Sequence, residues 1–179
     1  MRLARQARGD VDDLVAENID VALRFGELRS SSFVARKLGT NVRYVVAAPA
    51  YLEGRPRPRT PAELAGHACV LLSALNNEAE WELVSGRRRA RVRVVGAISS
   101  RDFRSVSFFV DRGHGVGLLP SSYCDAKIAE GALVRLLPQW SSPPLSVHAV
   151  YPTRKFLPEK VHVFLEKLRA WQSPFWSPA

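Results

Sequence analysis

Two adjacent serines, Ser99 and Ser100, begin the stretch of the chain best suited to hold a ligand. They precede a run with helical spacing, and serine oxygens accept hydrogen bonds from the backbone N–H groups of a first helical turn. Asp102 adds a negative charge where the helix dipole favours one. The N–H groups of that turn, through Phe103, could equally hold a small anion. We therefore predict a helix that starts here, with a plain helix cap and an anion site as alternatives.

The residues that follow predict the elements that would position this site. Phe103, Val106, Phe109 and Val110 form one apolar stripe, which is typical of a helix packed on one face, and a turn at Gly113 should end it. The run 116–119 is apolar at successive positions and Pro120 closes it, which indicates a buried strand. A helix, a tight turn and a buried strand in succession favour a parallel α/β sheet.

No pattern in the chain predicts catalysis, a metal site or a cofactor. The run 113–117 is rich in glycine, but it follows a helix and leads into a strand, the reverse of a phosphate-binding loop. Cys69 and Cys124 are far apart and have no metal-ligand spacing. The histidines lack both metal spacing and a nucleophile partner; they are His67, His114, His148 and His162. We predict that the protein is not an enzyme.

Composition indicates a globular protein with an excess of positive charge. The 179 residues are 46% hydrophobic and 24% charged, with a net charge of +9. The arginines gather in three clusters, none on a recognition helix, so they are either solvated surface groups or contacts to phosphate or a partner. The two unpaired cysteines, the polar first ten residues and the lack of a membrane-length apolar run lead us to expect a cytoplasmic protein.

Periodicity predicts most other elements. Alternation over 19–25 predicts a strand ended by Gly26, and Trp81–Val94 has the pattern of a hairpin. Thr60 and Glu63 have the spacing of a capping box, and Ser121 or Ser122 should cap another helix. Further strands are expected at 69–72, 133–137 and 145–151, an amphipathic helix at 157–168 and a loose tail at 172–179.

The order of these segments resembles the effector-binding domain of LysR-type transcriptional regulators over about residues 10–170. Each motif alone is weak and their combination is specific. The segments that carry the resemblance are DLVAENIDVALRFGEL (13–28), VARKLG (34–39), AAPAYL (47–52), PRTPAELAGHAC (58–69), RGHGVGLLP (112–120), GALVRLLPQW (131–140) and VHAVYPTRKFLPEKVHVFLEKL (147–168).

The resemblance implies an α/β, two-lobed domain like the type 2 periplasmic binding proteins. Residues 1–47 and 149–171 would form the first lobe and residues 48–148 the second. The chain has no counterpart of the family's helix-turn-helix domain, nor of the first strand and helix of the first lobe, so that lobe is expected to be incomplete. Residues 1–9 fit the expected second strand poorly.

The resemblance also implies a function in transcription regulation. A small molecule, expected to be anionic, would bind between the lobes, with Phe25, Gly26 and Glu27 facing the stretch from Ser99 to Phe103 that includes Arg101. The implied partners are this effector, a second copy of the chain or a full-length relative, and DNA only through a helix-turn-helix domain outside this chain. The alternatives are a truncated fragment without regulatory activity and a stand-alone small-molecule-binding protein.

Overall fold

The protein is described by a computed structural model that covers residues 3–5, 19–26, 33–72, 76–152, 158–171 and 176–178. The chain divides into two compact units, Met1–Asn41 with Pro144–Ala179 and Val42–Pro143. The boundaries expected from the sequence, after residues 47 and 148, lie a few residues beyond these contact-based divisions. Residues 11–15, where the apolar spacing of the sequence also predicts a short helix, lie outside the described residues.

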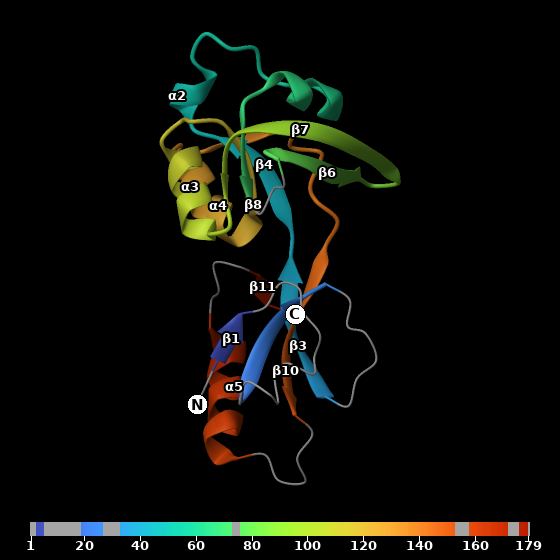
Figure 1. The fold of residues 1–179 in the computed structure, drawn as a ribbon, viewed down its shortest axis with the longest axis vertical. Coiled ribbons are helices and arrows are strands. Elements are labelled where there is room, and N and C mark those ends of the chain that lie inside the picture. Colours follow the sequence, from blue (N-terminus) through green and yellow to red (C-terminus); the bar gives the residue numbers. More distant parts are fainter. Residues whose placement is uncertain are drawn as a thin grey trace. The chain divides into compact units, whose positions relative to one another are not determined.

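In the described part of the first unit, five strands form one sheet (Figure 1). Their order is β1-β2-β10-β3-β11, and the bounds are β1 Leu3–Arg5, β2 Val21–Phe25, β3 Phe33–Asn41, β10 Leu145–Pro152 and β11 Ser177–Pro178. β1 is parallel to β2, and β10 runs antiparallel to both β2 and β3. Helix α5 (Glu159–Ala170) begins after Pro158 and buries Val161, Leu165 and Leu168 against this sheet's core. The amphipathic stripe thus forms the expected helix.

Both ends of the first unit differ from the sequence-based expectation. Leu3–Arg5, where no periodicity is visible, pairs with β2. The tail was predicted to be loose, and this is wrong for residues 176–178: β11 pairs with β3, and Trp176 is 2% exposed within the core. A two-residue strand carries too little pattern to be recognised, because its pairing depends on β3, far away in the sequence.

The second unit contains a six-stranded sheet among its described residues, in the order β6-β7-β5-β8-β4-β9. The strands are β4 Arg43–Ala47, β5 Cys69–Leu72, β6 Glu78–Ser85, β7 Arg88–Ser100, β8 Val116–Pro120 and β9 Val134–Leu136. β5 is parallel to β7 and β8, whereas the other neighbours are antiparallel, so the sheet is mixed and only its centre matches the predicted parallel arrangement. β6 and β7 form the predicted hairpin.

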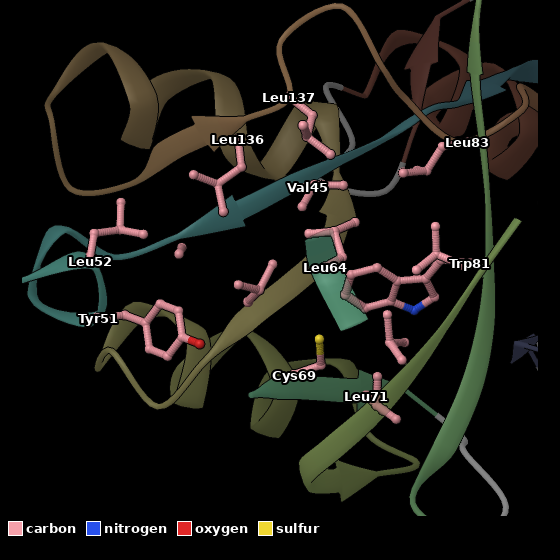
Figure 2. Packing of buried hydrophobic residues seen from close by; sticks show 14 residues of the cluster. Val45, Tyr51, Leu52, Leu64, Cys69, Leu71, Trp81, Leu83, Leu136 and Leu137 are labelled. Atoms are coloured by element: carbon pink, nitrogen blue, oxygen red, sulfur yellow. The ribbon is translucent and has the colours of Figure 1, made fainter. Parts of the chain in front are cut away.

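The two faces of this sheet bury alternate residues. The face covered by the short helices α2 (Pro49–Leu52) and η1 (Pro61–Gly66) holds the larger core, in which Leu64 packs near Trp81 and Val45 (Figure 2). Helix α3 (Phe103–Asp111) covers the other face, where a Cβ on Gly117 would lie only 2.5 Å from Val110 Cγ2. This alternation follows from the two-residue period of a strand.

Helix α4 (Ser121–Ala129) packs against β4 and β8 and is followed by Gly131, which has a φ of +73°. The prediction that Ser121 or Ser122 caps it is wrong, because the N-cap position is Pro120 and no side chain caps the helix. Ser121 is buried, and its N–H donates to the Val42 carbonyl at 2.7 Å. The strand therefore runs directly into the helix, and backbone contacts replace the expected cap.

Candidate functional site

Ser99 and Ser100 lie at the carboxyl end of β7, beside the carboxyl end of the parallel strand β5. Ser99 pairs with Leu71 and Ser100 with Leu72. Both serines are half-buried, and Leu72 is 43% exposed. Ligands of open α/β sheets bind outside the carboxyl ends of the strands. The two serines are therefore placed where this class of sheet holds ligands.

The helix that follows is capped by Asp102, so the prediction that Ser99 or Ser100 caps it is wrong. Asp102 Oδ2 accepts hydrogen bonds from the Ser105 N–H at 2.9 Å and the Ser105 hydroxyl at 3.0 Å. These bonds hold the pKa of the Asp102 carboxyl below its usual value. The cap is displaced because β7 stays paired with β5 through Ser100, and a cap must directly precede the first helical residue.

This displacement changes how an anion could be bound at the helix. The Asp102 carboxylate already accepts from first-turn donors and places a negative charge there. Ser100 Oγ accepts from the Asp102 N–H at 3.1 Å, which leaves the Ser100 O–H to donate to a ligand. Arg101 is exposed next to it. The polar groups suited to an anion are thus this hydroxyl and the Arg101 side chain, together with Ser99.

Phe103 is buried, and it anchors α3 on α4. Its ring meets the Tyr123 ring edge-on, with 5.3 Å between the centroids. Asp111, at the other end of α3, accepts hydrogen bonds from the Tyr123 hydroxyl at 2.7 Å and from Lys127 Nζ at 3.0 Å. The contacts of Phe103 and Asp111 with α4 therefore position the helix that follows the serines.

The predicted residues of the other lobe fall in the first unit. Phe25 is the last residue of β2, half-buried and in register with Val147. Gly26 has a φ of +99°, a left-handed conformation that favours glycine, and its N–H donates to the Ser146 carbonyl at 2.8 Å. Glu27 lies outside the described residues. Ser99, Ser100, Arg101 and Phe103 thus form one group in the second unit, and Phe25 and Gly26 end a strand of the first.

Other chemistry is limited in the part of the chain that the structure describes. Burial raises the pKa of Cys69 and of Cys124 to about 12, so both thiols stay protonated at neutral pH. No group of three or more His, Cys, Asp or Glu residues among the described positions could hold a metal ion. None of the described helices is long and apolar enough to span a membrane.

Comparison with known proteins identifies relatives along almost the whole chain. The HTH-type transcriptional regulator PtxR of Pseudomonas aeruginosa is 37% identical over 157 residues, which are 88% of this chain and 50% of PtxR. The HTH-type transcriptional activator AaeR of Escherichia coli is 32% identical over 157 residues, 87% of this chain and 50% of AaeR. The chain therefore spans about half the length of these curated relatives, which are transcriptional regulators.

Solved structures show the same fold. The regulatory domain of CrgA, a LysR-type transcriptional regulator from Neisseria meningitidis, has a TM-score of 0.77 at 28% identity and covers 92% of this chain and 80% of its own. The regulatory domain of AphB from Vibrio vulnificus has a TM-score of 0.69 at 30% identity, and the match covers 87% of this chain and 77% of the AphB chain. A family model described as the LysR substrate binding domain matches residues 1–173. The α/β chain therefore belongs to the LysR substrate-binding domain family, with the two-lobed fold of its regulatory domains.

Proposed function

We propose that this chain is the effector-sensing part of a LysR-type transcriptional regulator and that a small anionic molecule, bound between its two lobes, modulates transcription. The observation that carries the proposal is the position of Ser99 and Ser100 at the carboxyl end of β7, beside the parallel strand β5 and two residues ahead of α3. Membership of the family supports it, because the curated relatives are transcriptional regulators.

Ser100 donates its O–H to the effector in this proposal, and Arg101 supplies the positive charge. Ser99 lines the same strand end, and Phe103 holds the helix in place. Phe25, Gly26 and Glu27 contribute from the first lobe. The positive charge of Arg101 offsets the charge that Asp102 brings to the helix terminus. This set of groups fits a carboxylate better than a cation.

The proposed partners follow from the relatives. PtxR and AaeR are HTH-type (helix-turn-helix) regulators, so DNA would be contacted through such a domain and not through the effector domain. A second copy of the chain or a full-length relative is the proposed protein partner. The role is binding and signalling without a catalytic step.

Calorimetric titration with acetate, succinate and benzoate tests the effector site. We expect at least one of these carboxylates to bind, and we expect Ser100→Ala to weaken it by about tenfold or more, because a hydrogen bond to a charged group is typically worth about 1.5 to 3 kcal/mol. Ser85→Ala, in the β6–β7 hairpin, is the matched control and should leave the affinity unchanged. Equal affinities for the wild-type chain and Ser100→Ala would contradict the assigned role of Ser100.

A further inference from the structure

A hollow in the second unit is lined by none of the residues of the serine site. It has a volume of about 540 Å³, which is within the range of small-molecule sites. It is formed entirely by the segment that runs from α2 through the proline-rich loop and η1 to the start of β5. Its lining residues are Tyr51, Arg55, Pro56, Arg57, Pro58, Glu63, Gly66, His67 and Ala68.

Hydrogen bonds join His67, Tyr51 and the backbone of Ala68 in this pocket. The Tyr51 hydroxyl oxygen accepts the Ala68 N–H at 3.0 Å and lies 3.2 Å from His67 Nδ1. In the tautomer in which the Tyr51 O–H donates to Nδ1, the ring proton of a neutral His67 lies on Nε2. Burial, with the nearby Arg55 charge, lowers the pKa of His67, so the neutral ring prevails at pH 7. His67 therefore offers an N–H donor.

The two pocket arginines differ in what already holds them. Arg55 donates to the Tyr51 carbonyl at 3.0 Å, and its guanidinium lies 4.9 Å from the centre of the Tyr51 ring. Arg57 is exposed, and no ion pair within the described residues engages it. The Glu63 carboxylate accepts from the Arg59 N–H at 2.8 Å and the Thr60 hydroxyl at 2.9 Å. The pocket is thus lined by two guanidinium groups, Arg55 and Arg57, and by the Glu63 carboxylate, which already accepts hydrogen bonds from other donors.

The remaining walls are apolar and rigid. Pro56 and Pro58 have fixed backbone angles, and Pro58 is buried. Tyr51 belongs to the core cluster, in which Figure 2 shows its ring next to Leu52. A Cβ on Gly66 would meet nothing within 4 Å, so this side of the pocket is open. Apolar walls beside unengaged N–H donors match a ligand with an apolar body and one negative group.

We propose that this pocket binds a small organic carboxylate, with Arg57 and the His67 Nε2–H contacting the carboxylate and Pro56, Pro58 and Tyr51 contacting the apolar body. The site is separate from the effector site and does not depend on it. A carboxylate suits the pocket better than an amine, because two guanidinium groups, Arg55 and Arg57, line it with a single carboxylate, Glu63. A ligand without charge would leave the Arg57 guanidinium without a partner.

Titration with benzoate and its uncharged isostere benzamide tests the proposal on the full chain. We expect benzoate to bind, benzamide to bind at least tenfold more weakly, and Arg57→Gln to weaken benzoate by about tenfold. Arg59→Gln removes the same charge from the same loop, but its side chain does not line the pocket, so it should leave the affinity unchanged. Equal losses in both variants would indicate a general effect of charge and overturn the proposal.

Nitrogen-15 NMR of the histidine rings supplies a second readout that does not need the Arg57 variant. Benzoate should shift the His67 ring signals, which are assigned by their loss in His67→Gln. If Ser100→Ala abolished the binding of benzoate and benzoate left the His67 signals unshifted, benzoate would bind at the effector site. That result would overturn the pocket proposal and leave the effector site standing. Binding that depends on Arg57, with no carboxylate responding to Ser100→Ala, would support the pocket and contradict the effector site.

Discussion

At the residue scale, Asp102 serves two opposed requirements at the start of α3. Its carboxylate caps the helix by accepting from Ser105, which stabilises the first turn. The same negative charge lies beside Ser100 and Arg101, where we propose that an anion binds. A helix N-terminus that is capped by an aspartate is a weaker anion site than one capped by a serine, because the two negative charges repel each other.

Replacing Asp102 should separate these two effects. Asparagine is as good an N-cap as aspartate, so Asp102→Asn should retain the thermal midpoint while it strengthens the binding of the tested carboxylates. Asp102→Ala removes the acceptor and should lower the midpoint. Circular dichroism and calorimetry measure the two quantities. If Asp102→Asn lost as much stability as Asp102→Ala, charge and not capping would be the main contribution of this residue.

Two histidines should make the protein less stable in acid. Burial is the main cause that lowers the pKa of His67 and of His148 in the folded chain, with contributions from Arg55 and Lys37 respectively. The unfolded chain therefore binds protons more readily as the pH falls below the ordinary histidine value of 6.5. The free energy of unfolding should decline from pH 7 towards pH 5.5, and His67→Gln should reduce this slope. Urea titrations at several pH values measure the free energy of unfolding. Above pH 7.5 the two histidines are neutral in both the folded and the unfolded chain, so His67→Gln should leave the pH dependence there unchanged.

At the element scale, β11 shows how a short segment is held by partners that lie far away in the sequence. Ser177 and Pro178 pair with Thr40 and Gly39 of β3. Trp176, directly before them, packs among residues of α5, β3 and β10. The pairing adds an edge to the sheet and covers part of its core, so the segment contributes to stability although it contains only two paired residues.

Trp176→Ala should destabilise the protein by about 3 kcal/mol or more, the usual range for removing a buried large aromatic side chain. Trp171→Ala is the matched control, because Trp171 is 46% exposed and its ring lies 5.6 Å from that of Trp176. That change should cost at most about 1 kcal/mol. Denaturation in urea compares the two. Similar losses would mean that Trp176 is not part of the core.

At the scale of the whole molecule, the chain carries a net charge of +9. In the β6–β7 hairpin, Arg89 pairs with Glu82 at 3.0 Å, and Arg93 pairs with Glu78. These groups are exposed on a hairpin face, which fits the interpretation of the arginine cluster from Arg87 to Arg93 as solvated surface. Exposed ion pairs of this kind contribute little to stability. Their arginines can still attract phosphate when salt is low.

We therefore predict that this chain retains DNA weakly and without sequence preference. Reading bases needs a helix or ribbon placed in a groove, whereas scattered charge gives an attraction that falls steeply with salt. Gel shifts should show equal retention of an operator from a relative's promoter and of its scrambled version, and the retention should vanish at physiological salt. A preference for the operator at that salt would reveal a DNA-reading element in the chain.

The sequence by itself determined the types of most described elements and the family. The stripe through Val161, Leu165 and Leu168, the buried run of β8 and the hairpin of β6 and β7 all appear as predicted, because local periodicity encodes which face of an element is buried. The order of these elements along the chain was enough to identify the LysR substrate-binding domain.

Only the tertiary structure decided which residue caps α3, how β11 pairs and which side chains form the second pocket. Ser100 does not cap the helix because pairing with Leu72 keeps it in β7. The pocket depends on the contact between Tyr51 and His67, which the fold brings together from different elements. The physical reason is common to all three: local pattern specifies what each residue favours, whereas partners distant in the sequence decide which preference is satisfied.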